Sequence, residues 1–208
     1  ATVVVDRGMA YRENLKQIRG CGYHYLVASR QEERGEHLEE FESEEGWQEI
    51  VRVPSPSNPA QKKVPVFVKR CVCGEEVHIL CRSEGRQEKD RAIREKQEKR
   101  MLEDLSKLER RIREGRLRAE DKVHQAIGRL KERYPRVARY YQLLYDPAQQ
   151  RFSWQENLEK KIKAEELDGG YVLKTDRQDL SEEEIWRTYI LLTRVESAFR
   201  ALKSPLLE

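Results

Sequence analysis

Residues 2–28 read TVVVDRGMAYRENLKQIRGCGYHYLVA, and this stretch decides the fold class. It opens with a continuous apolar run that ends at Asp6. Leu15 and Ile18 then recur at helical spacing, before a Gly-Cys-Gly sequence ends the helix. A second apolar run follows at residues 23–28. Strand, short helix and strand are typical of an α/β unit whose strands are buried on both faces, as in a mostly parallel or mixed sheet.

Length and composition limit the class of protein. A chain of 208 residues fits one domain, or one domain with a large insertion. Apolar and charged residues each make up 38%, which indicates a modest core and long solvated helices. A net charge of +3 is too small to argue for nucleic acid by itself. No long apolar run or secretion leader is present, so we expect no membrane span and a cytoplasmic location.

The four cysteines are Cys21, Cys71, Cys73 and Cys81, too few to suggest a disulfide framework in a chain of this length. The pair at 71 and 73 lacks the two-residue gap of zinc knuckles. His78 and Cys81, the nearest further ligands, fall on the opposite arm of a predicted hairpin. We therefore expect buried or half-buried thiols rather than structural zinc.

The middle of the chain contains a predicted β-hairpin. Residues 47–53 alternate weakly as a strand, and a turn-rich linker follows at 53–59. Residues 64–72 and 76–81 are predicted to form two strands, joined by a tight turn in which Gly74 can adopt positive φ.

Arg, Lys, Glu and Gln dominate residues 85–133. Apolar residues recur there at four-three-four spacing, at Met101, Leu105, Leu108 and Ile112. Gly115 interrupts this phase, and a second apolar seam follows at Ala119, Val123, Ile127 and Leu130. We predict a helical hairpin over about 86–132. Its charges fit solvated helix faces with i,i+4 ion pairs. The alternative is an arm that contacts phosphate, but the mixed signs of the charges weaken this interpretation.

The last third of the chain begins with a second predicted hairpin. Residues 140–145 and 151–155 carry aromatic residues on both arms of a turn. A short helix over about 157–166 and a strand at 171–175 follow.

The final helix has a well-defined start. Ser181 is a suitable N-cap and Glu184 completes a capping box, while Leu180 and Ile185 can form a hydrophobic staple. Helical geometry places Glu196 on the same side as Ile185, within an apolar stripe.

A carboxylate in an apolar stripe needs a partner, because burying an ionised carboxylate alone costs several kcal/mol. One interpretation pairs Glu196 with Arg200 or Lys203 on the same helix. The other makes Glu196 a ligand of a divalent cation, with Asp6 at its strand end as the second contributor.

Two segments resemble a known family. Residues 3–9, VVVDRGM, followed by Glu-Asn-Leu at 13–15, resemble the segment around the second catalytic Asp of DDE-type bacterial insertion-sequence transposases. Tyr189, Glu196 and Lys203 resemble the Tyr-Arg-Glu-Lys motif of the same family, in spacing as well as in type.

The resemblance extends over nearly the whole chain in family order. Residues 168–175 resemble the strand that precedes the motif helix. The chain departs from the family at the arginine of the motif, where Leu192 stands.

The resemblance implies a chemistry. In this family, a ribonuclease H-like sheet presents three carboxylates to two Mg²⁺ (or Mn²⁺) ions for DNA cleavage and strand transfer. Asp6 and Glu196 would be catalytic metal ligands. Tyr189 and Lys203 would contact DNA phosphate at transposon ends and target, with Arg200 as a lesser candidate.

The implied fold is a mixed α/β one: a partial ribonuclease H-like fold carrying a large inserted α+β subdomain with hairpins and the helical hairpin. Residues 1–30 and 181–208 would form the core, and 31–180 the insertion. The first catalytic Asp of the family would precede residue 1, so we expect the chain to begin partway through the catalytic domain and to be inactive alone.

Two other classes stay open. A non-catalytic DNA-binding remnant would bind DNA with steep salt dependence and ignore the loss of Glu196. A helical interaction protein would form a homodimer through the apolar seam at Met101, Leu105, Leu108 and Ile112.

Overall fold

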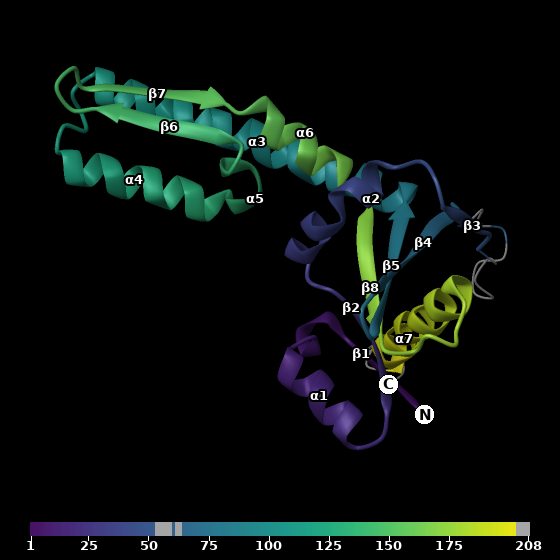
Figure 1. Ribbon diagram of the computed structural model, residues 1–208. Coiled ribbons are helices and arrows are strands. Elements are labelled where there is room, and N and C mark those ends of the chain that lie inside the picture. Colours follow the sequence, from purple (N-terminus) through teal and green to yellow (C-terminus); the bar gives the residue numbers. More distant parts are fainter. Residues whose placement is uncertain (53–59, 61–63, 203–208) are drawn as a thin grey trace. The chain divides into compact units, whose positions relative to one another are not determined.

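The computed structural model describes residues 1–52, 60 and 64–202, so the predicted linker at 53–59 lies outside the described residues. The chain divides into two compact units (Figure 1). The first joins Ala1–Gln87 to Gly169–Glu208, and the second is Glu88–Asp168. The second unit spans fewer residues than the insertion predicted at 31–180. The strands that precede it and the strand that follows it belong to the same sheet as the N-terminal strands.

The first unit is built on a six-stranded sheet in the order β1-β2-β8-β5-β4-β3. Its strands are β1 (Thr2–Val5), β2 (His24–Ala28), β3 (Gln48–Ile50), β4 (Val66–Cys73), β5 (Glu76–Ser83) and β8 (Gly170–Thr175). Only β1 and β2 pair in parallel among these strands, and the other neighbours are antiparallel. The mixed α/β class predicted from the sequence is confirmed.

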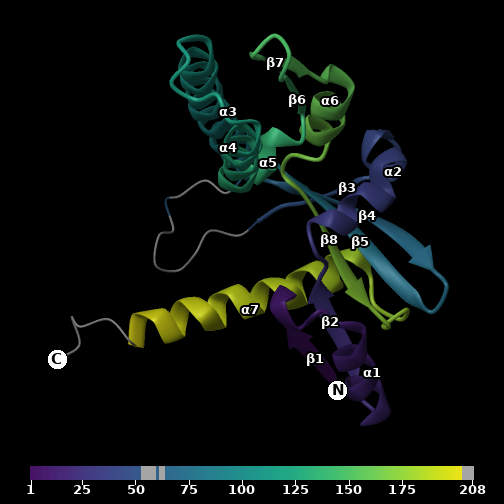
Figure 2. The same cartoon turned by 90° about the vertical axis from the view of Figure 1, so that its left-hand side faces the viewer.

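Helices cover both faces of this sheet (Figures 1 and 2). The helical segments of the first unit are η1 (Arg7–Met9), α1 (Arg12–Gly20), η2 (Glu32–His37), α2 (Leu38–Glu42) and α7 (Glu182–Leu202). Leu15 and Ile18 of α1 pack on Tyr25 and Val27 of β2. Residues of α7 pack against the other face, which carries Leu26. The predicted burial of β2 on both faces is therefore confirmed.

The start of α7 forms as its sequence predicts. The Oγ of Ser181 accepts a hydrogen bond from the backbone N–H of Glu184 at 3.3 Å, and the Glu184 carboxylate accepts the Ser181 N–H at 2.9 Å. One turn later, the indole N–H of Trp186 donates to the hydroxyl of Tyr171 at 2.7 Å inside the core. The cap and this buried bond fix the first half of α7 on the sheet.

The second unit is a helical hairpin packed on a β-hairpin (Figure 1). Its elements are α3 (Glu84–Arg113, which begins in the first unit), α4 (Glu120–Arg133), α5 (Pro135–Ala138), β6 (Tyr141–Asp146), β7 (Arg151–Glu156) and α6 (Leu158–Glu166). The predicted helical hairpin over about 86–132 and the predicted β-hairpin over 140–155 are both confirmed. The exposed side of α3 carries i,i+4 ion pairs such as Arg91–Glu95.

The apolar seam of α3 is the core of this unit. Met101, Leu105, Leu108 and Ile112 are buried together with Val123 of α4 and aromatic residues of the β-hairpin. A homodimer through this seam was expected for a helical interaction protein. That surface is not available, because α4 and the β-hairpin of the same chain already cover it.

No helix among the described residues is both long enough and apolar enough to cross a membrane.

Candidate functional site

Asp6 lies where β1 ends, and its backbone turns directly into η1. Its Oδ1 accepts the backbone N–H of Arg7 at 2.7 Å, which makes it the N-cap of that short helix. The carboxylate is exposed. The apolar strand thus delivers an accessible acid to the carboxyl end of the parallel pair β1–β2, the kind of strand end at which ligands commonly bind in parallel α/β sheets.

A cavity of about 560 Å³ opens beside Asp6. It is lined by Asp6, Arg7, Gly8, Tyr11, Arg30, Arg86 and Tyr189. Among the described residues, Asp6 is its only acid, whereas three guanidinium groups face it. The cavity therefore carries a positive balance of charge that suits an anion.

Two of the three arginines of this cavity are held by stacking on aromatic rings. The guanidinium of Arg30 lies 4.4 Å from the ring centroid of Tyr11, and that of Arg86 lies 4.3 Å from the ring of Tyr171. The Nε of Arg7 is buried and has no hydrogen-bond partner among the described residues. Stacked guanidinium groups keep their donors oriented, a geometry that matches phosphate oxygens.

Tyr189 reaches the same cavity from α7. Burial raises the pKa of its hydroxyl; Arg7 and Arg86 oppose this shift, while the charges of Asp6 and Glu196 add to it. The hydroxyl is therefore a protonated donor at neutral pH. Tyr189 also lies within electrostatic range of both acids that the sequence singled out.

The expectation that Glu196 sits in a buried apolar stripe is wrong. Glu196 is exposed, and so are Val195 and Phe199 beside it. The reason is that α7 extends past the edge of the sheet, so that only its first half, around Ile185, has a surface to pack on (Figure 2). The carboxylate stays in contact with water there, so its charge is not desolvated and needs no buried cation.

Two predicted phosphate contacts are not placed. The backbone of Arg200 belongs to α7, but its side chain lies outside the described part of the structure, and Lys203 lies outside it altogether. Of the five residues predicted for the site, Asp6 and Tyr189 line one cavity, and Glu196 is not among the described residues that line it.

Asp6 and Glu196 have the donor chemistry that Mg²⁺ requires, since this ion takes oxygen ligands and is commonly held by one or two carboxylates plus substrate phosphates. Both are exposed, and Asp6 also caps η1 through one of its oxygens. Neither belongs to a preassembled group of three ligands among the described residues. The two residues therefore match this ion in the type of donor atom.

No family model, curated protein or solved structure matches the chain.

Sequence reasoning missed the three arginines of the cavity. Arg7 and Arg30 carried a usable signal, because each follows shortly after one of two strands that pair in parallel, β1 and β2. Nothing in the sequence singles out Arg86, because it lies near the start of a long charged helix. Only the packing of the sheet brings it beside Tyr171.

Proposed function

We propose that the chain takes part in metal-dependent phosphoryl transfer on DNA, that is, cleavage and strand transfer of the DDE transposase type. One observation carries the proposal: Asp6 and Tyr189, two residues of the family motifs from opposite ends of the chain, line one cavity together with three arginines.

The arginines support binding of the DNA backbone. The cavity presents three planar donor groups, those of Arg7, Arg30 and Arg86. The only acid among its described lining residues is Asp6, directly after β1. Contacts of arginine with phosphate fix the position of a duplex without reading its sequence. The protonated hydroxyl of Tyr189 adds a further donor to a phosphate oxygen.

The acids support the metal part of the proposal. Asp6 and Glu196 would hold Mg²⁺ or Mn²⁺ beside the bound phosphate. When bound, such an ion activates the attacking oxygen and stabilises the leaving one. The resemblance implies three acids and assigns two of them here, so metal and DNA binding, rather than cleavage by the chain alone, are the properties to measure.

DNA binding is tested by fluorescence anisotropy of a labelled duplex over a series of salt concentrations. Loss of one phosphate contact reduces the slope of log affinity against log salt by about 1. We expect this reduction for Arg86→Ala and Arg30→Ala. Arg187→Ala, which removes the same charge from an exposed i,i+4 pair on α7, is the control and should leave the slope nearly unchanged. Equal slopes for all variants would refute phosphate binding in this cavity.

Metal binding is tested by electron paramagnetic resonance of Mn²⁺ in the presence of DNA. Asp6→Asn and Glu196→Gln should each release Mn²⁺, whereas Glu182→Gln at the start of α7 should not. If both site variants keep Mn²⁺ while the arginine variants lose DNA, the non-catalytic DNA-binding alternative replaces the transposase proposal.

A further inference from the structure

Three potential metal ligands from separate elements meet on the first unit, and none of them lines the cavity proposed to bind DNA. They are His37 at the end of η2, Cys73 at the end of β4 and His78 on β5. One ligand atom of each lies within 4.8 Å of the other two. Among the described residues, no other three His, Cys, Asp or Glu side chains gather this closely.

The spacing of the two imidazoles is close to that of two ligands on one ion. Nε2 of His37 and Nδ1 of His78 are 2.9 Å apart. Zn–N bonds of about 2.0–2.1 Å at tetrahedral angles place two nitrogens about 3.3 Å apart. The ring centroids lie 5.1 Å apart and the ring planes are inclined at 79°, with these two nitrogens directed at each other in a hydrogen bond. An ion would replace the proton of this hydrogen bond, with a small widening of the N···N distance and a turn of the His37 ring toward the ion.

The ring of His78 is held in the orientation that a ligand needs. Its side chain is buried, and its Nε2 faces a carboxylate oxygen of Glu76 at 3.4 Å. The other oxygen of Glu76 accepts the hydroxyl of Tyr25. A carboxylate that takes one ring N–H leaves the opposite nitrogen as a lone-pair donor, the arrangement found behind metal-binding histidines. Nδ1, directed at His37, is that nitrogen.

The hairpin register explains why sequence spacing was misleading here. We expected opposite arms to separate the cysteines from His78. In the antiparallel pairing, however, Cys71 lies opposite His78 and Cys73 lies opposite Glu76. Paired residues point to the same face of a sheet, so Cys73 and His78 are diagonal neighbours. His37 then approaches that face from η2.

We propose that His37, Cys73 and His78 bind a single Zn²⁺-type cation, with Glu76 as the positioning residue for His78. One thiolate and two imidazoles suit a borderline-soft ion and not Mg²⁺ or Ca²⁺, which prefer oxygen. Lys174, the nearby cation, is neutralised in an ion pair with Glu33. Three protein ligands leave the fourth tetrahedral position open to water or an exchangeable ligand. The bound ion would tie η2 to the β4–β5 hairpin.

The test uses the full chain, freed of metal and titrated with Co²⁺, whose bond to a thiolate gives a strong charge-transfer absorption. We expect that band with the unchanged chain, and its disappearance on adding Zn²⁺. Cys73→Ser should abolish it. Cys71→Ser, which changes the same residue type two positions away on the same strand, should keep it. His37→Ala should weaken Co²⁺ binding at least about tenfold, and Glu76→Gln by about 10–100-fold with the band retained.

Several outcomes would overturn the site. A band that survives Cys73→Ser, or that Cys71→Ser removes equally, would show that another thiol binds Co²⁺. Binding unchanged by His37→Ala would exclude the proposed ligand set. Circular dichroism of each metal-free variant separates lost ligation from lost folding, and Cys73 is the most informative position because its side chain is exposed. Asp6→Asn should leave the band unchanged, which keeps this test separate from that of the proposed function.

Discussion

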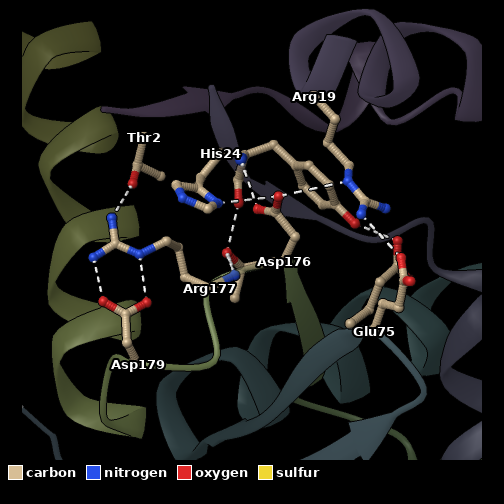
Figure 3. Close-up of polar contacts among 10 residues, drawn as sticks. Thr2, Arg19, His24, Glu75, Asp176, Arg177 and Asp179 are labelled. Carbon is tan, nitrogen blue, oxygen red and sulfur yellow. Dashed lines mark hydrogen bonds and ion pairs between the residues drawn. The ribbon is translucent and has the colours of Figure 1, made fainter. Parts of the chain in front are cut away.

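The carboxylate of Asp176 accepts the backbone N–H of Tyr25 at 3.0 Å, one residue beyond the point where the ladder between β2 and β8 ends (Figure 3). Its other oxygen lies 3.1 Å from Nδ1 of His24. The side chain is only 8% exposed. Asp176 thus extends the sheet through a side chain and fixes β2, and with it the parallel partner β1 that carries Asp6.

Asp176→Ala should lower the free energy of unfolding by about 1–3 kcal/mol, because it leaves the N–H of buried Tyr25 without an acceptor. Urea denaturation measures the loss. Asp179→Ala is the matched control: it breaks an ion pair with Arg177 in which the aspartate side chain is 64% exposed, and it should cost less than about 1 kcal/mol. Equal losses would show that the Asp176 bond does not support the sheet.

Gly169→Ala should destabilise the first unit by about 2–4 kcal/mol, since it combines positive φ with overpacking. Gly169 has φ of +73°, and a Cβ there would lie 2.6 Å from the carbonyl oxygen of Ser83 and 2.8 Å from the backbone N of Gln87. Gly128→Ala, in the interior of α4 with open space around it, should instead stabilise by about 0.5–1 kcal/mol. Thermal unfolding of the two variants gives the comparison, and a neutral Gly169→Ala would contradict the close approach.

Acid should weaken the second unit partly through Glu98. Burial alone would raise the pKa of this carboxyl, but hydrogen bonds from the Tyr141 hydroxyl at 2.6 Å and the Lys161 ammonium at 2.9 Å, with the charge of Lys161, hold it below its usual value. Because the folded pKa lies below the unfolded value of about 4.3, this stabilisation is complete above that pH. It is lost as pH falls through the folded pKa.

Glu98→Gln should therefore be less stable than the unchanged chain near neutral pH, and the difference should shrink below about pH 4.3. Urea unfolding between about pH 3 and pH 6 measures it, with Glu103→Gln as a control that has the same change on α3. A difference that stays constant with pH would show that Glu98 does not contribute through its charge.

Leu105→Ala should cost about 2–5 kcal/mol, the range for emptying a buried leucine site. Leu105 is fully buried within the second unit, whereas Ile93 on the same helix is 44% exposed, so Ile93→Ala should cost much less. Sedimentation should show no change of assembly state for Leu105→Ala. A shift from dimer to monomer in that variant would instead support the helical interaction protein that the covered seam argues against.

The sequence by itself predicted the local elements. The β6–β7 hairpin, the β4–β5 hairpin, the helical hairpin and the capped start of α7 are all found within a few residues of their predicted bounds. These features depend on neighbours in the chain: alternation of apolar residues, glycine at a turn, and a serine three residues before a glutamate. Asp6 at the end of its strand belongs to the same group, because the apolar run before it ends there.

Only the tertiary structure decided what meets at the sites. No local pattern places Arg86 beside Tyr171, or His37 beside His78, because those neighbours are set by strand order and by hairpin register over long separations. The burial of Glu196 failed as a prediction for the same reason: helical periodicity shows which side of α7 is apolar, but not how far the sheet beneath it extends. The propensity of a segment to form a helix, strand or turn depends on residues that are close in sequence. Burial and ligand geometry depend instead on which surfaces pack together in the folded chain.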